Sequence, residues 1–391
     1  MPLTIKRDRF FWTIALQTFV VNFFLGGFGP AQPLLRADQH TSLAVAGLHG
    51  TAMGIASIFC GLSIPRMTHR FGRAQTGWIG LIIFSFGLLA LAFVQPIQLT
   101  ILAAFVASFG CSTVINSFVV SLNSHYGELA PVAVGQANGI SSAGYVVGTT
   151  TIGTIAQTAP HFWRMGLILI LPLALYLYFF RRDRTVESHT PSTDGPQGGR
   201  LSIAFWITWA GFVATISTEF ATAFWAAALV RDRTDATAAI STIAIIALGV
   251  GMAIGRFFGG RLMHRLAADT QLQIVLGIQA LGFFGLWLSH NLAISLLMLL
   301  INGLGISMQF ALTSLRLINQ SEGRPELAIG TSSLAAGLAI AGAPFLLGVL
   351  GDNYGISRAY LMVPVLILIA SLIVKLVPAH VPQADLDRFE I

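Results

Sequence analysis

Charged side chains are scarce in this chain, because Asp, Glu, Lys and Arg make up 10% of its 391 residues while hydrophobic residues make up 55%. Soluble domains carry about 25% charged residues. The mean hydropathy of +0.76 is likewise far above that of a soluble domain. A water-soluble globular protein is therefore excluded, and we predict a polytopic membrane protein.

Cysteine is also scarce, and its two copies, Cys60 and Cys111, both fall inside apolar runs. Neither a disulfide framework nor a cysteine-based metal site is expected. The chain has no paired-histidine metal motif and no recognisable Ser/His or Asp/Asp catalytic constellation, which disfavours an enzyme, a bound metal and a cofactor. No cleavable signal peptide is evident, because the segment after Arg9 is too long and carries Gln17 and Asn22.

The basic residues are spread over short loops. The formal net charge of +6 does not indicate nucleic-acid binding, because no aromatic residues alternate with the Lys and Arg residues. With both termini on the cytoplasmic side of twelve spans, only five of the 22 basic residues lie in outer loops: Arg36, Arg164, Arg231, Arg233 and Arg358. The excess of Lys and Arg in inner loops predicts a multi-pass inner (plasma) membrane protein with both termini cytoplasmic.

Apolar runs of about 20 residues, the length that crosses a bilayer, recur twelve times. They cover residues 11–35, 43–64, 75–94, 98–121, 133–158, 163–180, 201–229, 237–259, 272–290, 292–315, 327–350 and 359–377. A Ser/Thr/Pro/Gly-rich stretch near the midpoint indicates a flexible polar linker. We predict an all-α fold with two pseudo-symmetric six-helix bundles, residues 1–180 and 201–391, joined by a cytoplasmic linker at 181–200.

One basic stretch occurs twice, as Arg66–Arg70 and Arg261–Arg265, 195 residues apart. Five glycine pairs keep the same offset: Gly54 and Gly249, Gly87 and Gly282, Gly110 and Gly305, Gly135 and Gly330, and Gly153 and Gly348. A constant offset over this length indicates a duplication, and we call this spacing the repeat offset. Two six-helix copies inserted in the same direction are the parallel-repeat plan of a secondary transporter, which places the substrate site between the copies near the midplane.

The two basic stretches resemble the signature of the major facilitator superfamily, Gly-x-x-x-Asp-Arg-x-Gly-Arg, which lies between the second and third helices with a weaker copy between the eighth and ninth. Here the two copies are Pro65–Arg73 and Gly260–Leu266. Arg70, Gly72 and Arg73 match the signature. His69 replaces its acidic residue, and His264 stands in the second copy. Two further stretches resemble motifs that are common in this family: Gly351–Gly355 with Arg358, and Trp163–Arg164.

The resemblance implies a transporter that works by alternating access, with the family's inner-face gate in the basic turns. A gating role is implied for the following residues: His69, Arg70, Arg73, His264 and Arg265. The family's proton-driven drug exporters carry an arginine in the fourth helix and a Gly-Pro pair in the fifth. This chain has neither feature in the corresponding spans, which disfavours a multidrug exporter.

Of the 16 acidic residues, Glu219 alone lies well inside a predicted span, the seventh. Lipid penalises an ionisable group by several kcal/mol, so we expect Glu219 to face the bundle interior or water. It is a candidate for proton coupling or for contact with a basic substrate, and the alternative is a hydrogen-bonded structural role. At the repeat offset its counterpart is Phe24, so the carboxylate belongs to one half only.

Uncharged polar side chains inside the spans are candidates for substrate binding. Six are proposed: Gln17, Asn22, Asn116, Tyr145, Asn302 and Gln309. Amides and hydroxyls bind an uncharged or zwitterionic solute at low desolvation cost, but they also join membrane helices to one another. Gln17 and Asn22 are five residues apart, about 140° around a helix, so they cannot both point into one cavity.

Arg256 and Arg316 lie near the inner ends of their predicted spans. Contact with an anionic substrate is one interpretation. The simpler one, which we favour, is that both side chains extend to the cytoplasmic interface.

Taken together, these patterns predict a secondary active transporter that moves a small organic solute by alternating access and is coupled to protons through Glu219. The partners expected are a small-molecule substrate, protons or another coupling ion, and the lipid bilayer. We expect a monomer. The alternatives are an uncoupled facilitator, a multidrug exporter and a membrane receptor that does not transport.

Overall fold

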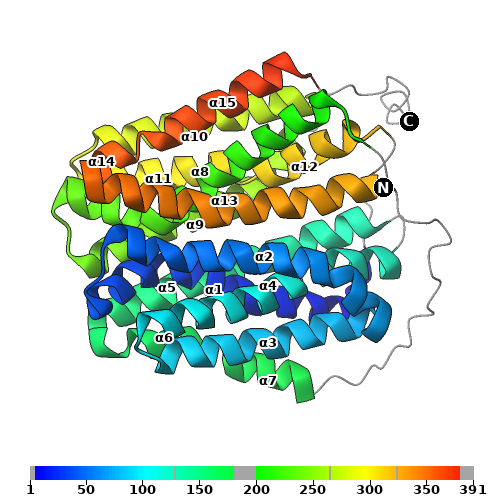
Figure 1. Cartoon of the computed structure of the whole chain (residues 1–391), viewed down its shortest axis with the longest axis horizontal. Helices are drawn as coiled ribbons and strands as arrows, with labels where there is room; N and C mark the ends of the chain where they lie inside the picture. Colours follow the sequence, from blue (N-terminus) through cyan, green and yellow to red (C-terminus); the bar gives the residue numbers. More distant parts are fainter. Residues whose placement is uncertain (1–4, 127–128, 180–199, 264–265, 323–324, 379–391) are drawn as a thin grey trace.

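The structure is a computed structural model that describes residues 5–126, 129–179, 200–263, 266–322 and 325–378. Its described residues form long, roughly parallel helices with short turns between them, and no strand is found among them (Figure 1). The expectation of an all-α polytopic fold is confirmed.

Twelve helical passes are formed by the described residues, six in each half. The first half consists of α1 (Arg9–Gln39), α2 (Leu43–Phe71), α3 (Arg73–Phe93), α4 (Ile97–Tyr126), α5 (Ala130–Thr158), and a sixth pass made of η2 (Pro160–Phe162), α6 (Trp163–Ile168) and α7 (Leu171–Phe179). The second half consists of α8 (Ile203–Thr234), α9 (Ala238–Met263), α10 (Ala268–Leu288), a broken pass of α11 (Leu292–Ile306) and α12 (Gln309–Asn319), α13 (Pro325–Tyr354), and a last pass of α14 (Ile356–Ala359) and α15 (Met362–Leu376).

The molecule has two ends, which we name by the helices that meet there. The terminal face is the end where α1 and α8 begin and α15 ends, and the distal face is the opposite end (Figure 1). Polar residues mark the helix starts, because Asp8, Ser42 and Ser202 each accept a hydrogen bond from a backbone N–H in the first turn of α1, α2 and α8. Gly72 separates α2 from α3 with φ of 80°, a left-handed conformation that glycine adopts without strain.

Ten helices among the described residues are long and apolar enough to cross a membrane, and Ala244–Gly259 is a shorter apolar helix. Two of the twelve predicted spans, which correspond to α5 and α9, are therefore absent from the ten. The sequence of α5 explains its low hydropathy, because it is rich in Gly, Ser and Thr. Both of these helices pack at the boundary between the halves, where small and polar residues are tolerated.

The helix boundaries keep the repeat offset that the sequence shows. Four pairs of helices begin at positions separated by this offset: α2 and α9, α3 and α10, α4 and α11, and α5 and α13. His40 and Asp235, which are related by the same offset, both end their helices in the left-handed conformation. The two halves therefore share one helical framework without an insertion over most of its length.

The halves meet mainly along two helix pairs, α2 with α13 and α5 with α9. Close approach in the first pair depends on glycine, because a methyl group at Gly54 would collide with the backbone of Ala341. The Thr51 hydroxyl donates a hydrogen bond of 2.8 Å to the carbonyl oxygen of Ala341. Near the middle of the molecule, the backbone of Gly29 on α1 likewise packs against the carbonyl oxygen of Ala223 on α8.

Candidate functional site

A cavity of about 120 Å³ lies between the two halves. Its walls come from α1, α2 and α5 of the first half and from α8 and α9 of the second. The polar lining residues are Asn22, Tyr145, Glu219 and Arg256. The other lining residues are Leu25, Phe28, Gly29, Met53, Phe220, Ala223, Phe224, Leu248 and Met252. This largely apolar site has one side chain of each charge on its wall.

Glu219 lies near the middle of α8, a helix of 32 residues. Its Oε1 is 3.9 Å from Nη2 of Arg256, and its side chain is 18% exposed. Because the exposed part lines the cavity, the carboxylate is directed to the space between the halves and not to lipid. A carboxylate in this position can exchange protons with solvent that enters the cavity, or it can contact a solute.

Arg256 contacts three parts of the chain besides its own α9: α8, α5 and the turn between α11 and α12. It faces Glu219 on α8, its Nη1 donates to the Ser142 hydroxyl on α5 at 3.3 Å, and its Nε donates to the carbonyl oxygen of Ser307 at 3.4 Å. The expectation that Arg256 extends to the cytoplasmic interface is wrong, because its guanidinium contacts a carboxylate and two oxygen acceptors between the helices. Arg256 is thus the one cation among the residues that line the cavity.

The polar groups from the first half lie opposite this charge pair. Asn22 on α1 uses its amide nitrogen to donate to the carbonyl oxygen of Thr18 at 3.0 Å, which leaves its side-chain oxygen available to the cavity. The Tyr145 ring on α5 packs against Gly249 of α9. Phe28 and Phe224 line the cavity from opposite halves with ring centroids 5.5 Å apart.

The remaining predicted binding residues do not line this cavity. Gln17 is buried inside the first half, and the amide of Asn116 donates to the carbonyl oxygen of Ser112 at 2.8 Å. Asn302 and Gln309 are buried inside the second half. Of the six polar residues predicted from sequence, the cavity therefore brings together Asn22 and Tyr145 with Glu219.

The predicted gating residues of the first basic turn lie at the terminal face, far along α2 from the cavity. Arg70 is exposed, and its guanidinium carbon is 5.4 Å from the centroid of the Phe71 ring. His69 belongs to the last turn of α2 and Arg73 to the first turn of α3, but their side chains are outside the described part of the structure. The other two, His264 and Arg265, lie outside the described residues.

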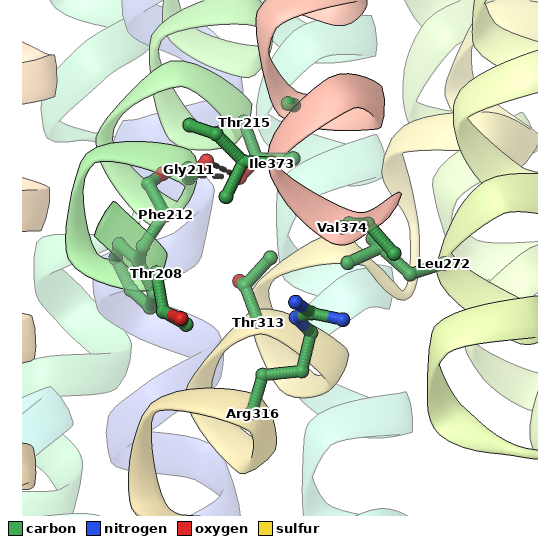
Figure 2. A pocket seen from close by; sticks show the side chains of 10 residues that line it. Thr208, Gly211, Phe212, Thr215, Leu272, Thr313, Arg316, Ile373 and Val374 are labelled. Atoms are coloured by element: carbon green, nitrogen blue, oxygen red, sulfur yellow. Dashed lines mark hydrogen bonds between the residues drawn. The ribbon is translucent and has the colours of Figure 1, made fainter. Parts of the chain in front are cut away.

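A second cavity, of about 10 Å³, lies inside the second half near the terminal face (Figure 2). Arg316 on its wall is 2% exposed, and it pairs with Asp269. Its Nη2 also donates to the carbonyl oxygen of Val377 at 2.6 Å. The expectation that Arg316 extends into the interface is therefore wrong, because Asp269 neutralises its charge inside the protein.

Arg256 is the cavity-lining residue that sequence reasoning misplaced. One signal in the sequence was available to find it. Its counterpart at the repeat offset is Gly61, so, like Glu219, it introduces a charge into one half only.

Comparisons with known proteins agree with the fold. A model of the Major Facilitator Superfamily matches residues 14–321. A bacterial homolog of the human lysosomal transporter Spinster, in an inward-facing and occupied conformation, is similar in structure with a TM-score of 0.74 and 14% identity over 96% of this chain and 97% of that chain. The nucleoside transporter NupG is similar with a TM-score of 0.74 and 11% identity over 94% of this chain and 99% of that chain. No curated protein matches the sequence.

Proposed function

Because the chain belongs to the Major Facilitator Superfamily, we propose that it is a secondary active transporter that moves a small organic solute by alternating access and is coupled to protons through Glu219. The family and the similar structures make it a membrane transporter with a small-molecule substrate. The observation that supports the finer proposal is the pair of Glu219 and Arg256 in the cavity between the halves.

The charge pair offers a physical mechanism for coupling. When Glu219 takes up a proton, its attraction to the guanidinium of Arg256 is lost. Arg256 can then strengthen its contact with Ser142, which lies in the other half. The protonation of Glu219 is thereby linked to the contact between the halves, and a proton gradient can bias the equilibrium between the two cavity openings.

The cavity lining narrows the chemistry of the solute. Phe28, Phe220 and Phe224 provide an apolar wall, while the carboxylate, the guanidinium, an amide and a phenol provide a few polar contacts. Sites of this kind bind a ligand with an apolar body and fix its orientation through its polar groups. We propose a zwitterionic or uncharged polar solute with an apolar or aromatic body.

The orientation and the domain boundaries are part of the proposal. The charge distribution favours a cytoplasmic terminal face, so the linker at 181–200 would join the bundles 1–180 and 201–391 on that side. The gating role proposed for the basic turn at Arg70 also belongs to that face, and the same role is proposed for Arg265 from its correspondence in sequence. We propose that a single chain is the transporting unit, because the cavity is lined by both halves of one chain.

A solute screen followed by transport in liposomes tests this function. Thermal-shift measurements over amino acids, sugars, carboxylates, nucleosides and cationic drugs identify ligands of the parent protein. In liposomes with a pH gradient, Glu219→Gln should abolish accumulation of that ligand but leave its exchange, because a glutamine cannot take up a proton. Asn116 is a polar residue of a span outside the cavity, so the Asn116→Ala variant should accumulate the ligand as the parent protein does.

The same assay separates the alternatives. If accumulation by the Glu219→Gln variant still depends on pH, Glu219 is not the residue that couples transport to protons. Movement that is indifferent to pH in the parent protein identifies an uncoupled facilitator. A ligand that binds but is not moved by the parent protein identifies a receptor.

A further inference from the structure

Four uncharged polar residues form a cluster inside the second half, apart from the cavity between the halves. Gln309 Nε2 donates to Gln279 Oε1 at 2.7 Å, and Gln279 Nε2 donates to Thr218 Oγ1 at 2.9 Å. Asn302 on α11 packs against Gly282 of α10, about one turn along that helix from Gln279. Each of the four side chains is at most 1% exposed.

Three polar atoms of this cluster have no hydrogen-bond partner among the described residues, namely Oδ1 and Nδ2 of Asn302 and Oε1 of Gln309. Buried amides in native proteins are nearly always paired, either with protein or with ordered water. Asn302 offers a donor and an acceptor, and Gln309 offers an acceptor. Bridging water molecules satisfy such a set of groups.

The first half shows that the framework does not need these polar groups. At the repeat offset, the four counterparts are buried apolar residues: Phe23, Phe84, Ala107 and Val114. The helix contacts are the same, because a methyl group at Gly87 would collide with the backbone of Ala107, as one at Gly282 would with that of Asn302. One framework thus packs with an apolar interior in one half and with a polar interior in the other.

The cluster continues to the small cavity near the terminal face. The Thr313 hydroxyl donates to the carbonyl oxygen of Gln309 at 2.6 Å. Thr313 and Thr208 line the cavity together with Arg316 (Figure 2), and the Thr208 hydroxyl has no partner within the described chain. A volume of about 10 Å³ is close to the minimum that holds one water molecule.

At its other end, the cluster reaches the charge pair. Thr218 directly precedes Glu219 in α8. Ser307, whose carbonyl oxygen accepts from Arg256, lies in the break between α11 and α12, two residues before Gln309. A break of this kind frees backbone carbonyl groups, which membrane proteins tolerate where the backbone is buried in protein or lines a water-filled space.

We infer that this cluster is a water-binding site and that, together with the small cavity at Arg316, it forms a water-lined path inside the second half from the terminal face to the helical turn of Glu219. Its ligand is water. The path runs within one bundle, so it remains in place when a solute fills the cavity between the halves. Its use for delivering protons to Glu219 rests on the proposed function, whereas its hydration does not.

Accessibility of engineered thiols to Ag⁺ tests the path. Ag⁺ is small, travels only through water and binds a thiol firmly. In a background with Cys60→Ala and Cys111→Ala, we compare Gln309→Cys with Val114→Cys, its counterpart in the first half. The intact protein is treated with Ag⁺, then denatured and alkylated, and mass spectrometry measures the fraction of protected thiol. Gln309→Cys should be protected and Val114→Cys should be alkylated.

Equal alkylation of both thiols would overturn the inference. If Gln309→Cys does not fold, the pair Thr313→Cys and Phe118→Cys carries the same comparison one turn along the path. Thermal unfolding of Asn302→Leu adds a second readout, since an amide that binds only water can be replaced with little loss of stability, whereas a large drop in the midpoint would assign Asn302 a purely structural role. Neither measurement involves transport, so both can fail while the proposed function stands.

Discussion

Arg256 and Glu219 show at the scale of single residues how a duplicated framework becomes asymmetric. Their counterparts at the repeat offset are Gly61 and Phe24, neither of which carries a charge. The pair is held on adjacent helices of one half, yet Arg256 also donates to Ser142 of the other half. One replaced position in each of two helices therefore creates both the charge pair of the cavity and a contact between the halves.

Removal of one member of this pair should destabilise the protein more than removal of both. Arg256→Gln leaves the Glu219 carboxylate without a cation, at a cost of about 1–3 kcal/mol, below that of a fully buried pair because both side chains are partly exposed. The double variant Arg256→Gln/Glu219→Gln should regain part of that loss. Thermal unfolding in detergent at neutral pH measures the cycle, and additive effects would show that the two groups do not interact.

Asp8 predicts a pH dependence at the terminal face. Burial disfavours its charged form, but hydrogen bonds from the Phe11 N–H, His125 and Tyr126 outweigh this and hold the pKa of Asp8 below its usual value. A lowered pKa in the folded state adds stability above the unfolded pKa, near 3.9, and this stability is lost as the pH falls through the folded pKa. Asp8→Asn should therefore unfold at lower temperature than the parent at pH 7, and the gap should close in acid. A gap that is independent of pH would contradict this.

At the scale of helices, the contact between α2 and α13 depends on a glycine. Gly54→Ala would place a methyl group against the backbone of Ala341, and overpacking of this kind costs about 1–3 kcal/mol. Gly342 on α13 provides the control, because a methyl group there meets nothing within 4 Å. Gly54→Ala should lower the thermal midpoint and Gly342→Ala should keep or raise it, since alanine favours helix by about 1 kcal/mol. Similar shifts in both variants would show that the close approach is not limiting.

At the scale of the whole molecule, a single carboxylate joins the halves at the distal face. Asp352, near the end of α13, accepts hydrogen bonds from the backbone N–H groups of Leu43 at 2.9 Å and Ala44 at 2.7 Å, in the first turn of α2. A negative charge at a helix N-terminus is stabilising. This contact joins the distal ends of the two halves.

Neutralisation of Asp352 should favour the form that is open at the distal face. Asp352→Asn weakens the interaction with the start of α2 by about 1 kcal/mol. Spin-label distances between the turn before α2 and the turn after α13 should lengthen on average in the variant. The neighbouring variant Asn353→Ala serves as the control, because the Asn353 amide bonds within its own helix, to the carbonyl oxygen of Val349. Unchanged distances in Asp352→Asn would rule out a closing role.

Side-chain placement is where sequence reasoning reached its limit. Spacing indicates that residues seven apart share a helical face, but Asn302 and Gln309 are separated by the break at Ser307 and lie inside one bundle. Depth along a helix placed Arg256 near an interface, although the acceptors that hold it lie on α8, α5 and the α11–α12 break. Partners on other helices are not encoded in local spacing.

By itself, the sequence determined the membrane class, the helical fold and the internal repeat. Apolar runs and a constant offset are properties of the linear sequence, and they can be recognised without knowledge of how the helices pack. Only the tertiary structure decided that Glu219 meets Arg256, that Asn22 and Tyr145 share their cavity, and that Asp352 bonds to the start of α2. These pairs depend on how each helix is rotated and which helix it packs against. Contacts between distant segments set that rotation, and similar apolar spans do not distinguish one such arrangement from another.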